Sequence, residues 1–295
     1  MERRRQQATA RDGRTLAFAE WGDPEGFPVF SLHGTPTSRL WRHPDEGRYA
    51  DAGVRVITYD RPGYGGSDRH RGRRVVDCAA DVEAIADHLG LDRFAVTGRS
   101  GGGPHSLAVA ARLPERVVRA ESVVGIAPFD AAGLDWFEGM DANNVRETSW
   151  ALAGEEVAAR ELEREAAELL ARIEAEASAV LGDDWELAPV DRAALARPEL
   201  AGVIREAFGE AFRNGAWGWV DDDLAFVSGW GFDVAEIRVP TRIVYGAEDA
   251  LVPAGHGEWL ARHVPGAELV VERELGHFAD PAAVVEQFRR LAQPA

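Results

Sequence analysis

The chain has 295 residues, of which 45% are hydrophobic and 28% charged, the composition of a globular protein with a sizeable core. Its net charge of −17 at pH 7 argues against nucleic acid or an anionic membrane as a partner. No apolar run approaches the roughly 20 residues of a membrane span. The basic start of the chain lacks the apolar stretch of a secretory signal, so we expect a cytoplasmic protein.

The first third of the chain predicts strands and one helix. Two alternating stretches around an Asp-Gly dipeptide predict a hairpin over 8–22. Short apolar runs at 28–33 and 54–59 predict buried parallel strands. Apolar residues recur at helical spacing over 75–89 and include Cys78, which we therefore expect in the core. As the single cysteine, it excludes an internal disulfide.

The next elements alternate between strand and helix. An apolar run predicts a strand at 94–99, a helix follows over 101–113, and another strand is expected at 117–124. Alternating strands resume at Val239, and Asp280-Pro281 is a typical start for the closing helix. This order predicts an α/β fold with a parallel sheet covered on both faces. Ligands bind such sheets beyond the carboxyl ends of the strands.

The segment 130–233 differs in composition from its surroundings. It contains six of the nine tryptophans. The stretch 191–213 reads as one helical region, and 155–181 as another, with a single apolar face. The members of that face are Leu162, Ala166, Leu169, Ile173, Ala177 and Val180. We interpret 130–233 as a helical cap inserted between two parts of a core domain, 1–129 and 234–295.

Three residue types typical of nucleophilic catalysis follow predicted strands. Ser100 lies in Gly-Arg-Ser-Gly-Gly at 98–102, where a turn too tight for a flanking Cβ would lift the hydroxyl off the sheet edge. Asp249 and His277 each follow a strand-like run. A serine hydroxyl is a weak nucleophile until an imidazole accepts its proton, and a buried carboxylate can hold that imidazole in the useful tautomer.

Together these motifs resemble the α/β-hydrolase superfamily of the lidded type. The matching segments are His33-Gly34-Thr35-Pro36, Asp60-Arg61-Pro62-Gly63-Tyr64-Gly65-Gly66-Ser67-Asp68, the turn at Ser100, Asp249 and His277. The resemblance implies a mostly parallel sheet flanked by helices, with Ser100 as nucleophile, His277 as base and Asp249 as acid. It places the oxyanion-binding N–H groups at Thr35 and Gly101.

The sequence leaves the roles of several residues near these motifs open. Glu248 or Asp130 could replace Asp249 as the acid. His33 is expected to support its own loop. Arg99 could pair with Asp60 or meet an acidic group of a substrate. No histidine cluster has the spacing of metal ligands, so neither a metal nor a cofactor is expected.

The chemistry predicts a serine hydrolase that acts on an ester, lactone or thioester of small size, as a monomer or weak homodimer. Four cap tryptophans could line an apolar or aromatic substrate pocket or form the cap's own core: Trp136, Trp150, Trp217 and Trp219. One alternative is an aminopeptidase of the prolyl-iminopeptidase kind, with carboxylates from 221–223 or 155–176 holding the amino terminus. The other is a non-hydrolytic lyase, cyclase or receptor, which the fold also hosts.

Overall fold

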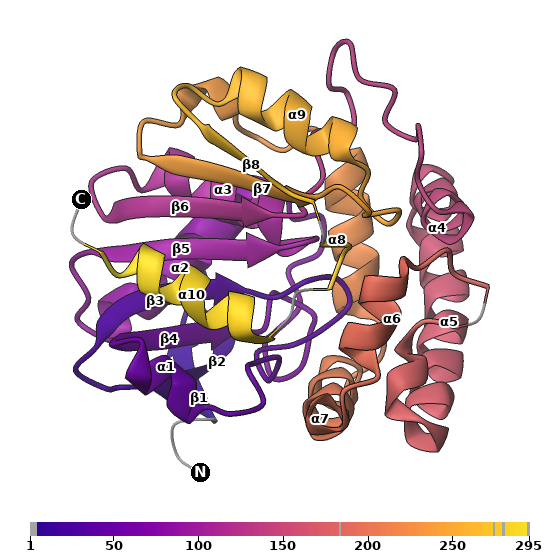
Figure 1. Cartoon of the computed structure of the whole chain (residues 1–295), viewed down its shortest axis with the longest axis horizontal. Helices are drawn as coiled ribbons and strands as arrows, with labels where there is room; N and C mark the ends of the chain where they lie inside the picture. The colour runs from indigo at the N-terminus through magenta and orange to yellow at the C-terminus, as the bar shows by residue number, and fades with distance from the viewer. Residues whose placement is uncertain (1–4, 183, 274, 279–280, 294–295) are drawn as a thin grey trace.

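The computed structural model describes residues 5–182, 184–273, 275–278 and 281–293, and its centre is a twisted, eight-stranded sheet (Figure 1). The strand order is β1-β2-β4-β3-β5-β6-β7-β8; β2 pairs antiparallel with β1 and β4, and all other pairs are parallel. In chain order the strands are β1 (Gln6–Thr9), β2 (Thr15–Gly22), β3 (Phe27–Leu32), β4 (Val54–Tyr59), β5 (Phe94–Arg99), β6 (Val117–Val123), β7 (Thr241–Gly246) and β8 (Glu268–Glu272).

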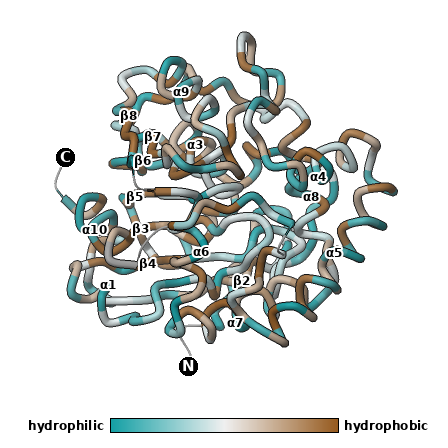
Figure 2. The backbone as a smooth tube through the Cα atoms, turned by 45° about the vertical axis from the view of Figure 1, so that its right-hand side comes forward, coloured by the Kyte–Doolittle hydropathy of each residue, from teal (hydrophilic) through white to brown (hydrophobic). Residues whose placement is uncertain are grey.

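The predicted fold class and hairpin are confirmed. The hairpin is β1–β2, and its turn needs Gly13 because the backbone φ there is +89°, a value that side chains with a Cβ disfavour. The central strands are apolar along most of their length because helices cover both faces of the sheet. Figure 2 shows this contrast: the middle strands are largely brown, whereas the outer helices carry much teal.

Helices cover the two faces of the sheet unequally. One face carries α2 (Cys78–His88), α3 (Gly102–Arg112) and α9 (Ala254–His263), which share the largest hydrophobic cluster. The other carries the short α1 (Gly47–Asp51) and α10 (Pro281–Leu291). Cys78 lies in the core as predicted. The motifs above predicted neither α1, which has only five residues, nor α9, whose buried apolar side chains are only Trp259 and Leu260.

Helices α4 to α8 lie beyond the carboxyl ends of the parallel strands (Figure 1). They are α4 (Ala142–Leu152), α5 (Glu155–Ala175), α6 (Pro189–Leu195), α7 (Ala201–Ala211) and α8 (Trp217–Val227). Short 3₁₀ turns occur at Val75–Asp77, Ala177–Val180, Pro198–Leu200 and Val234–Glu236. All six residues of the predicted apolar face of 155–181 are buried, in a cluster that also contains Tyr64 from the core. We refer to α4–α8 as the cap.

The ends of the inserted segment pack into the core rather than into the cap. Trp136, Phe226 and Trp230 belong to the same hydrophobic cluster as α3. Helix α8 therefore runs from the cap into the core, and its side chains are placed to contact the loops that follow the strands.

The closing helix buries Phe288 and Leu291 against the sheet, while Asp280, its expected first residue, lies outside the described residues. None of the helices within the described part of the chain combines the length and the apolar character needed to cross a bilayer.

Leu162 tests the contribution of the cap's own core. Its side chain is fully buried, so Leu162→Ala should lower the free energy of unfolding by about 2–5 kcal/mol, through lost apolar contact and a residual cavity. Leu152, on the neighbouring helix, is 50% exposed, and Leu152→Ala should change it by about 0.5 kcal/mol or less. Urea denaturation measures the free energy of unfolding of both variants, and equal losses would contradict the burial of Leu162 in the cap.

Candidate active site

Four loops meet at the carboxyl edge of the sheet. Strands β3, β5, β7 and β8 lie in one parallel array, and the residues after them carry Thr35, Ser100, Asp249 and His277. Because parallel strands end at the same edge, side chains far apart in the chain come together there.

The turn at Ser100 is held in a strained conformation. Its backbone φ is +53°, a left-handed value that is uncommon for a residue with a side chain. A Cβ at Gly98 would lie 1.9 Å from the carbonyl oxygen of Gly102, and one at Gly102 would lie 2.2 Å from that of Leu32. Both glycines are therefore sterically required, and the turn directs Ser100 to the wall of a cavity.

The imidazole of His277 is bonded to a buried carboxylate. His277 Nδ1 lies 2.8 Å from Asp249 Oδ2. Because a carboxylate accepts, Nδ1 carries the proton, and Nε2 remains available as an acceptor. The N–H groups of Leu251 and Val252 each donate to Asp249 Oδ1 at 2.9 Å and fix the carboxylate. Glu248, the neighbouring alternative, has an exposed side chain.

The second alternative acid, Asp130, is likewise exposed, and among the described residues it forms neither a hydrogen bond nor an ion pair with His277. Ser100 and His277 line the same cavity, and the structure contains no hydrogen bond between them within the described residues. The geometry thus favours Asp249 over both alternatives as the partner of the imidazole.

Thr35 and Gly101 lie side by side, and each has a backbone N–H group. Neither donates to a protein acceptor within the described part of the chain. A Cβ added to Gly101 would lie 2.2 Å from Thr35 Oγ1, so the two residues are in close contact beside Ser100. This arrangement can bind a negatively charged oxygen.

His33 supports the loop that carries Thr35. Its Nδ1 donates to the carbonyl of Gly34 at 2.8 Å, and its Nε2 accepts the N–H of Arg61 at 3.2 Å. Burial and the Arg61 guanidinium hold the pKa of His33 well below its ordinary value. The neutral ring that results fits one donated and one accepted bond, which is the structural role expected from the sequence.

Two further residues hold the backbone of His277. Arg99 Nη1 donates to the His277 carbonyl at 2.6 Å, and Asp191 in α6 accepts the N–H groups of His277 at 2.9 Å and Phe278 at 2.6 Å. The expected pair of Arg99 with Asp60 is wrong, because Asp60 binds the guanidinium and N–H of Arg39 instead. Sequence analysis missed Asp191, which lies 86 residues from its partner with no motif around it.

The cavity next to Ser100 has a volume of about 240 Å³ and lies between core and cap. Trp150 and Trp219 line it as predicted, together with Trp41 and Trp185, which were not predicted to do so. The remaining apolar wall combines side chains of the core, such as Leu32 and Phe288, with six from the cap segment, namely Leu169, Val180, Leu181, Leu195, Leu200 and Phe208.

Two of the four proposed tryptophans lie elsewhere. Trp136 lines a smaller adjoining cavity of about 80 Å³, and its Nε1 donates to the carbonyl of Ala127. Trp217 lines neither cavity: it is 39% exposed, and the Arg69 guanidinium stacks 3.8 Å from its ring centre. Trp217 is the first residue of α8 and faces solvent. The expectation that it lines the pocket is therefore wrong.

An acidic pair lies in the smaller cavity. Glu147 of α4 and Asp223 of α8 contact each other there, and Glu147 Oε1 accepts from Trp219 Nε1 at 2.7 Å. Burial, then the Glu147 carboxylate, raise the pKa of Asp223 well above its ordinary value, and burial also raises the pKa of Glu147. The described residues contain no cluster of three or more potential metal ligands.

Asp223 should make stability depend on pH. Because its pKa is raised on folding, the folded protein binds an extra proton above about pH 4, and stability falls as pH rises toward the raised pKa. Between pH 5 and 8, the wild type should therefore lose more of its free energy of unfolding than Asp223→Asn does. Urea denaturation at both pH values measures the difference.

The neighbours Glu147, Asp222 and Arg73 remain in Asp223→Asn, so the comparison reports proton binding by the coupled pair of Asp223 and Glu147. The control is Glu168→Gln on the exposed face of α5, which should keep the wild-type pH dependence. Parallel curves for wild type and Asp223→Asn would contradict a protonated Asp223.

Known proteins share this architecture. The family described as alpha/beta hydrolase fold matches residues 28–279. A proline iminopeptidase of Neisseria gonorrhoeae is 29% identical over 294 residues, covering 90% of this chain and 88% of that protein. A proline iminopeptidase of Xanthomonas citri is 32% identical over 146 residues, covering 47% of this chain and 45% of that protein.

The chain spans only 44% to 64% of the length of several curated relatives that it matches. Among solved structures, a thermophilic esterase from Thermogutta terrifontis with malate bound superposes with a TM-score of 0.66 at 23% identity. That match covers 98% of this chain and 99% of the esterase.

Proposed function

Because the chain belongs to the α/β-hydrolase fold family, we propose that it is a serine hydrolase that cleaves a carboxylic ester, lactone or thioester through an acyl-enzyme. The observation that carries this proposal is the 2.8 Å bond between His277 Nδ1 and Asp249 Oδ2, at the cavity whose wall includes Ser100. Such a bond leaves Nε2 ready to accept a proton.

In the first half of the reaction, Ser100 Oγ attacks the carbonyl carbon while His277 Nε2 accepts the hydroxyl proton. The resulting imidazolium is stabilised by the Asp249 carboxylate. The negative charge on the carbonyl oxygen is bound by the N–H groups of Thr35 and Gly101, each typically worth a factor of about 10²–10³ in rate. A protonated His277 could not accept the serine proton, so the step needs the neutral imidazole.

In the second half, the imidazolium returns its proton to the leaving alcohol or thiol as the bond to the carbonyl carbon breaks. The acyl group is then bonded to Ser100 Oγ. His277 next accepts a proton from water, whose oxygen attacks the acyl carbon, and Ser100 leaves with the proton. The products are a carboxylic acid and the free enzyme.

The cavity supports a small, apolar acyl or alcohol group as substrate. Its volume of about 240 Å³ is below the range of roughly 300–1,000 Å³ that is common for drug-sized ligands. Its apolar wall includes the indole rings of Trp150 and Trp219 and aliphatic side chains of cap and core, so burial of apolar surface would drive binding.

Ser100→Ala should abolish turnover of aryl esters, lactones and thioesters, because it removes the attacking oxygen. It should also abolish covalent labelling by a fluorophosphonate, which reacts with an activated serine. The wild type should label and turn over at least one substrate class in a panel. Circular dichroism checks that the variant is folded.

The same experiment separates hydrolysis from the non-hydrolytic alternatives. A folded wild type that neither labels nor releases acid from any member of the panel would contradict the proposal. That result would favour a binding or cyclase role. The presence of a bonded His277–Asp249 pair argues against a pure receptor, which has no need of a proton acceptor.

One observation favours a second candidate, an aminopeptidase that removes an amino-terminal residue. The acidic pair Glu147–Asp223 lines the cavity adjoining Ser100, and Asp223 Oδ2 has no hydrogen-bond partner within the described residues. A substrate ammonium group there would neutralise the pair and satisfy that oxygen. The relative from Neisseria gonorrhoeae named above is a proline iminopeptidase.

A matched pair of substrates tests this candidate. Proline arylamide carries the cationic amine, and N-acetylproline arylamide lacks it. An aminopeptidase should cleave only the first, and Asp223→Asn should raise its KM because an ion pair is lost. If the enzyme cleaves aryl esters but leaves both arylamides intact, the candidate is rejected and the esterase proposal stands.

A further inference from the structure

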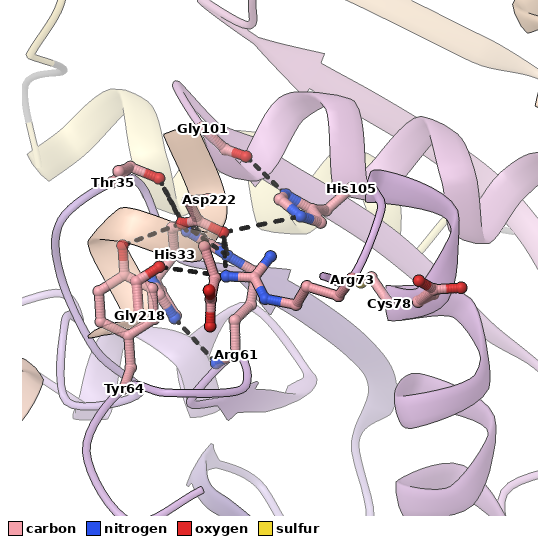
Figure 3. Close-up of polar contacts among 12 residues, drawn as sticks. His33, Thr35, Arg61, Tyr64, Arg73, Cys78, Gly101, His105, Gly218 and Asp222 are labelled. Carbon is pink, nitrogen blue, oxygen red and sulfur yellow. Dashed lines mark hydrogen bonds and ion pairs between the residues drawn. The ribbon is translucent and has the colours of Figure 1, made fainter. Parts of the chain in front are cut away.

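A cap residue binds the loop that carries the proposed oxyanion donor. Asp222 of α8 is fully buried, and Thr35 Oγ1 donates to its Oδ2 at 2.6 Å (Figure 3). The two residues are 187 positions apart in the chain. Asp222 does not line either cavity beside Ser100, so it has no direct contact with a substrate there.

The carboxylate of Asp222 is saturated with donors. Besides Thr35, Oδ2 accepts from Arg61 Nη2 at 2.6 Å and from Tyr64 OH at 2.9 Å, and Oδ1 accepts from Arg73 Nη2 at 2.7 Å. The Arg61 and Arg73 guanidinium groups hold the pKa of Asp222 well below its ordinary value despite its burial. The group is therefore a fixed anion with every lone pair engaged.

The same network fixes the peptides before Thr35. Arg61 Nη1 donates to the carbonyl of His33, and Nη2 donates to Thr35 Oγ1 at 3.0 Å and lies 3.4 Å from the carbonyl of Gly34. Asp222 holds Arg61 in place, and Arg61 holds these groups. As a result, both the backbone and the side chain of Thr35 are constrained, which sets the direction of its N–H.

A buried ion cluster of this kind carries a large desolvation free energy, because each charge loses its hydration on burial. Simple attachment of cap to core is already supplied by the hydrophobic contacts of Phe226 and Trp230. What apolar packing cannot supply is a directional bond to Thr35 Oγ1. Oxyanion stabilisation depends on the orientation of the N–H donors, because a donor is effective only when it points at the developing charge.

We propose that Asp222 is a positioning residue, through which the cap orients the Thr35 N–H toward the oxyanion. Asp222 touches no reacting atom and acts through the Thr35 hydroxyl. This inference rests on the proposed serine-hydrolase function and adds the cap to the machinery that stabilises the transition state.

Thr35→Val tests the link with little change of shape, because valine replaces the hydroxyl by a methyl group and keeps the backbone N–H. Misplacement of a group by about 1 Å can cost up to roughly 10² in rate. We therefore expect kcat for an aryl ester to fall by about 10–100-fold while KM changes by less than about 3-fold. Thr35→Ser, which retains the hydroxyl, should restore kcat to within about 3-fold of wild type.

Inhibitors supply a readout that a merely structural role would not change. An aryl trifluoromethyl ketone adds Ser100 to its carbonyl and places an oxyanion between Thr35 and Gly101, whereas the matching methyl ketone binds mainly as an intact ketone. Thr35→Val should weaken the trifluoromethyl ketone by the same factor as kcat. The affinity of the methyl ketone should stay within about 3-fold.

Asp222→Asn should act in the same direction, and Asp221→Asn is its matched control. Asp221 is the preceding residue of α8, is also buried, and pairs with Arg69 at 2.8 Å without a hydrogen bond to Thr35. The control should lose thermal stability but keep kcat. If Asp222→Asn does not fold, the comparison of Thr35→Val with Thr35→Ser still decides the question.

The outcomes separate the two proposals. An active wild type whose Thr35→Val variant keeps full kcat and full affinity for the trifluoromethyl ketone overturns the positioning role and leaves the serine-hydrolase function intact. Equal loss of kcat in Thr35→Val and Thr35→Ser also overturns it, since the hydroxyl would then be irrelevant. A wild type without any ester turnover or serine labelling removes the hydrolase function and this inference together.

Discussion

The buried Asp222 carboxylate is the contact on which the arrangement of the site depends. It joins α8 of the cap to Thr35, Arg61 and Arg73, which belong to separate loops of the core. A lone carboxylate at this depth would be costly, and two guanidinium groups offset that cost. Because the charges compensate one another only when all are in place, the loops beside Ser100 and the cap helix specify each other's positions.

Three successive carboxylates of α8 are in three different electrostatic environments. Asp221 is buried and pairs with the partly exposed Arg69, Asp222 is an anion between two arginines, and Asp223 lies against Glu147 with a raised pKa. Adjacent residues of a helix point about 100° apart, so each side chain faces a different neighbour. In the sequence the three residues form one acidic run, which offers them together as ligands of an amino group. The structure leaves only Asp223 at the wall of a cavity beside Ser100.

Sequence analysis predicted the parts of the site that are defined by short motifs at strand ends. The glycines around Ser100 and the residues after β7 and β8 could be recognised because a tight turn needs glycine and parallel strands end at one edge. The residues that hold these groups could not, because their partners are distant in the chain: Asp191 binds His277, and Asp222 binds Thr35. Of the four tryptophans considered for the pocket, only Trp150 and Trp219 line the larger cavity, since a helical cap can present a given indole to a cavity, to its own core or to solvent.

The sequence by itself determined the α/β architecture, the run of helices between two strands of the sheet, and the strand ends that Ser100, Asp249 and His277 follow. These follow from local periodicity and local sterics, which depend on residues a few positions apart. Tertiary structure decided which carboxylate meets His277, where Arg99 donates, and which cap side chains form the cavity wall. Those outcomes depend on how burial pairs charges across long loops, and the energy of a buried charge is set by neighbours in space rather than in sequence.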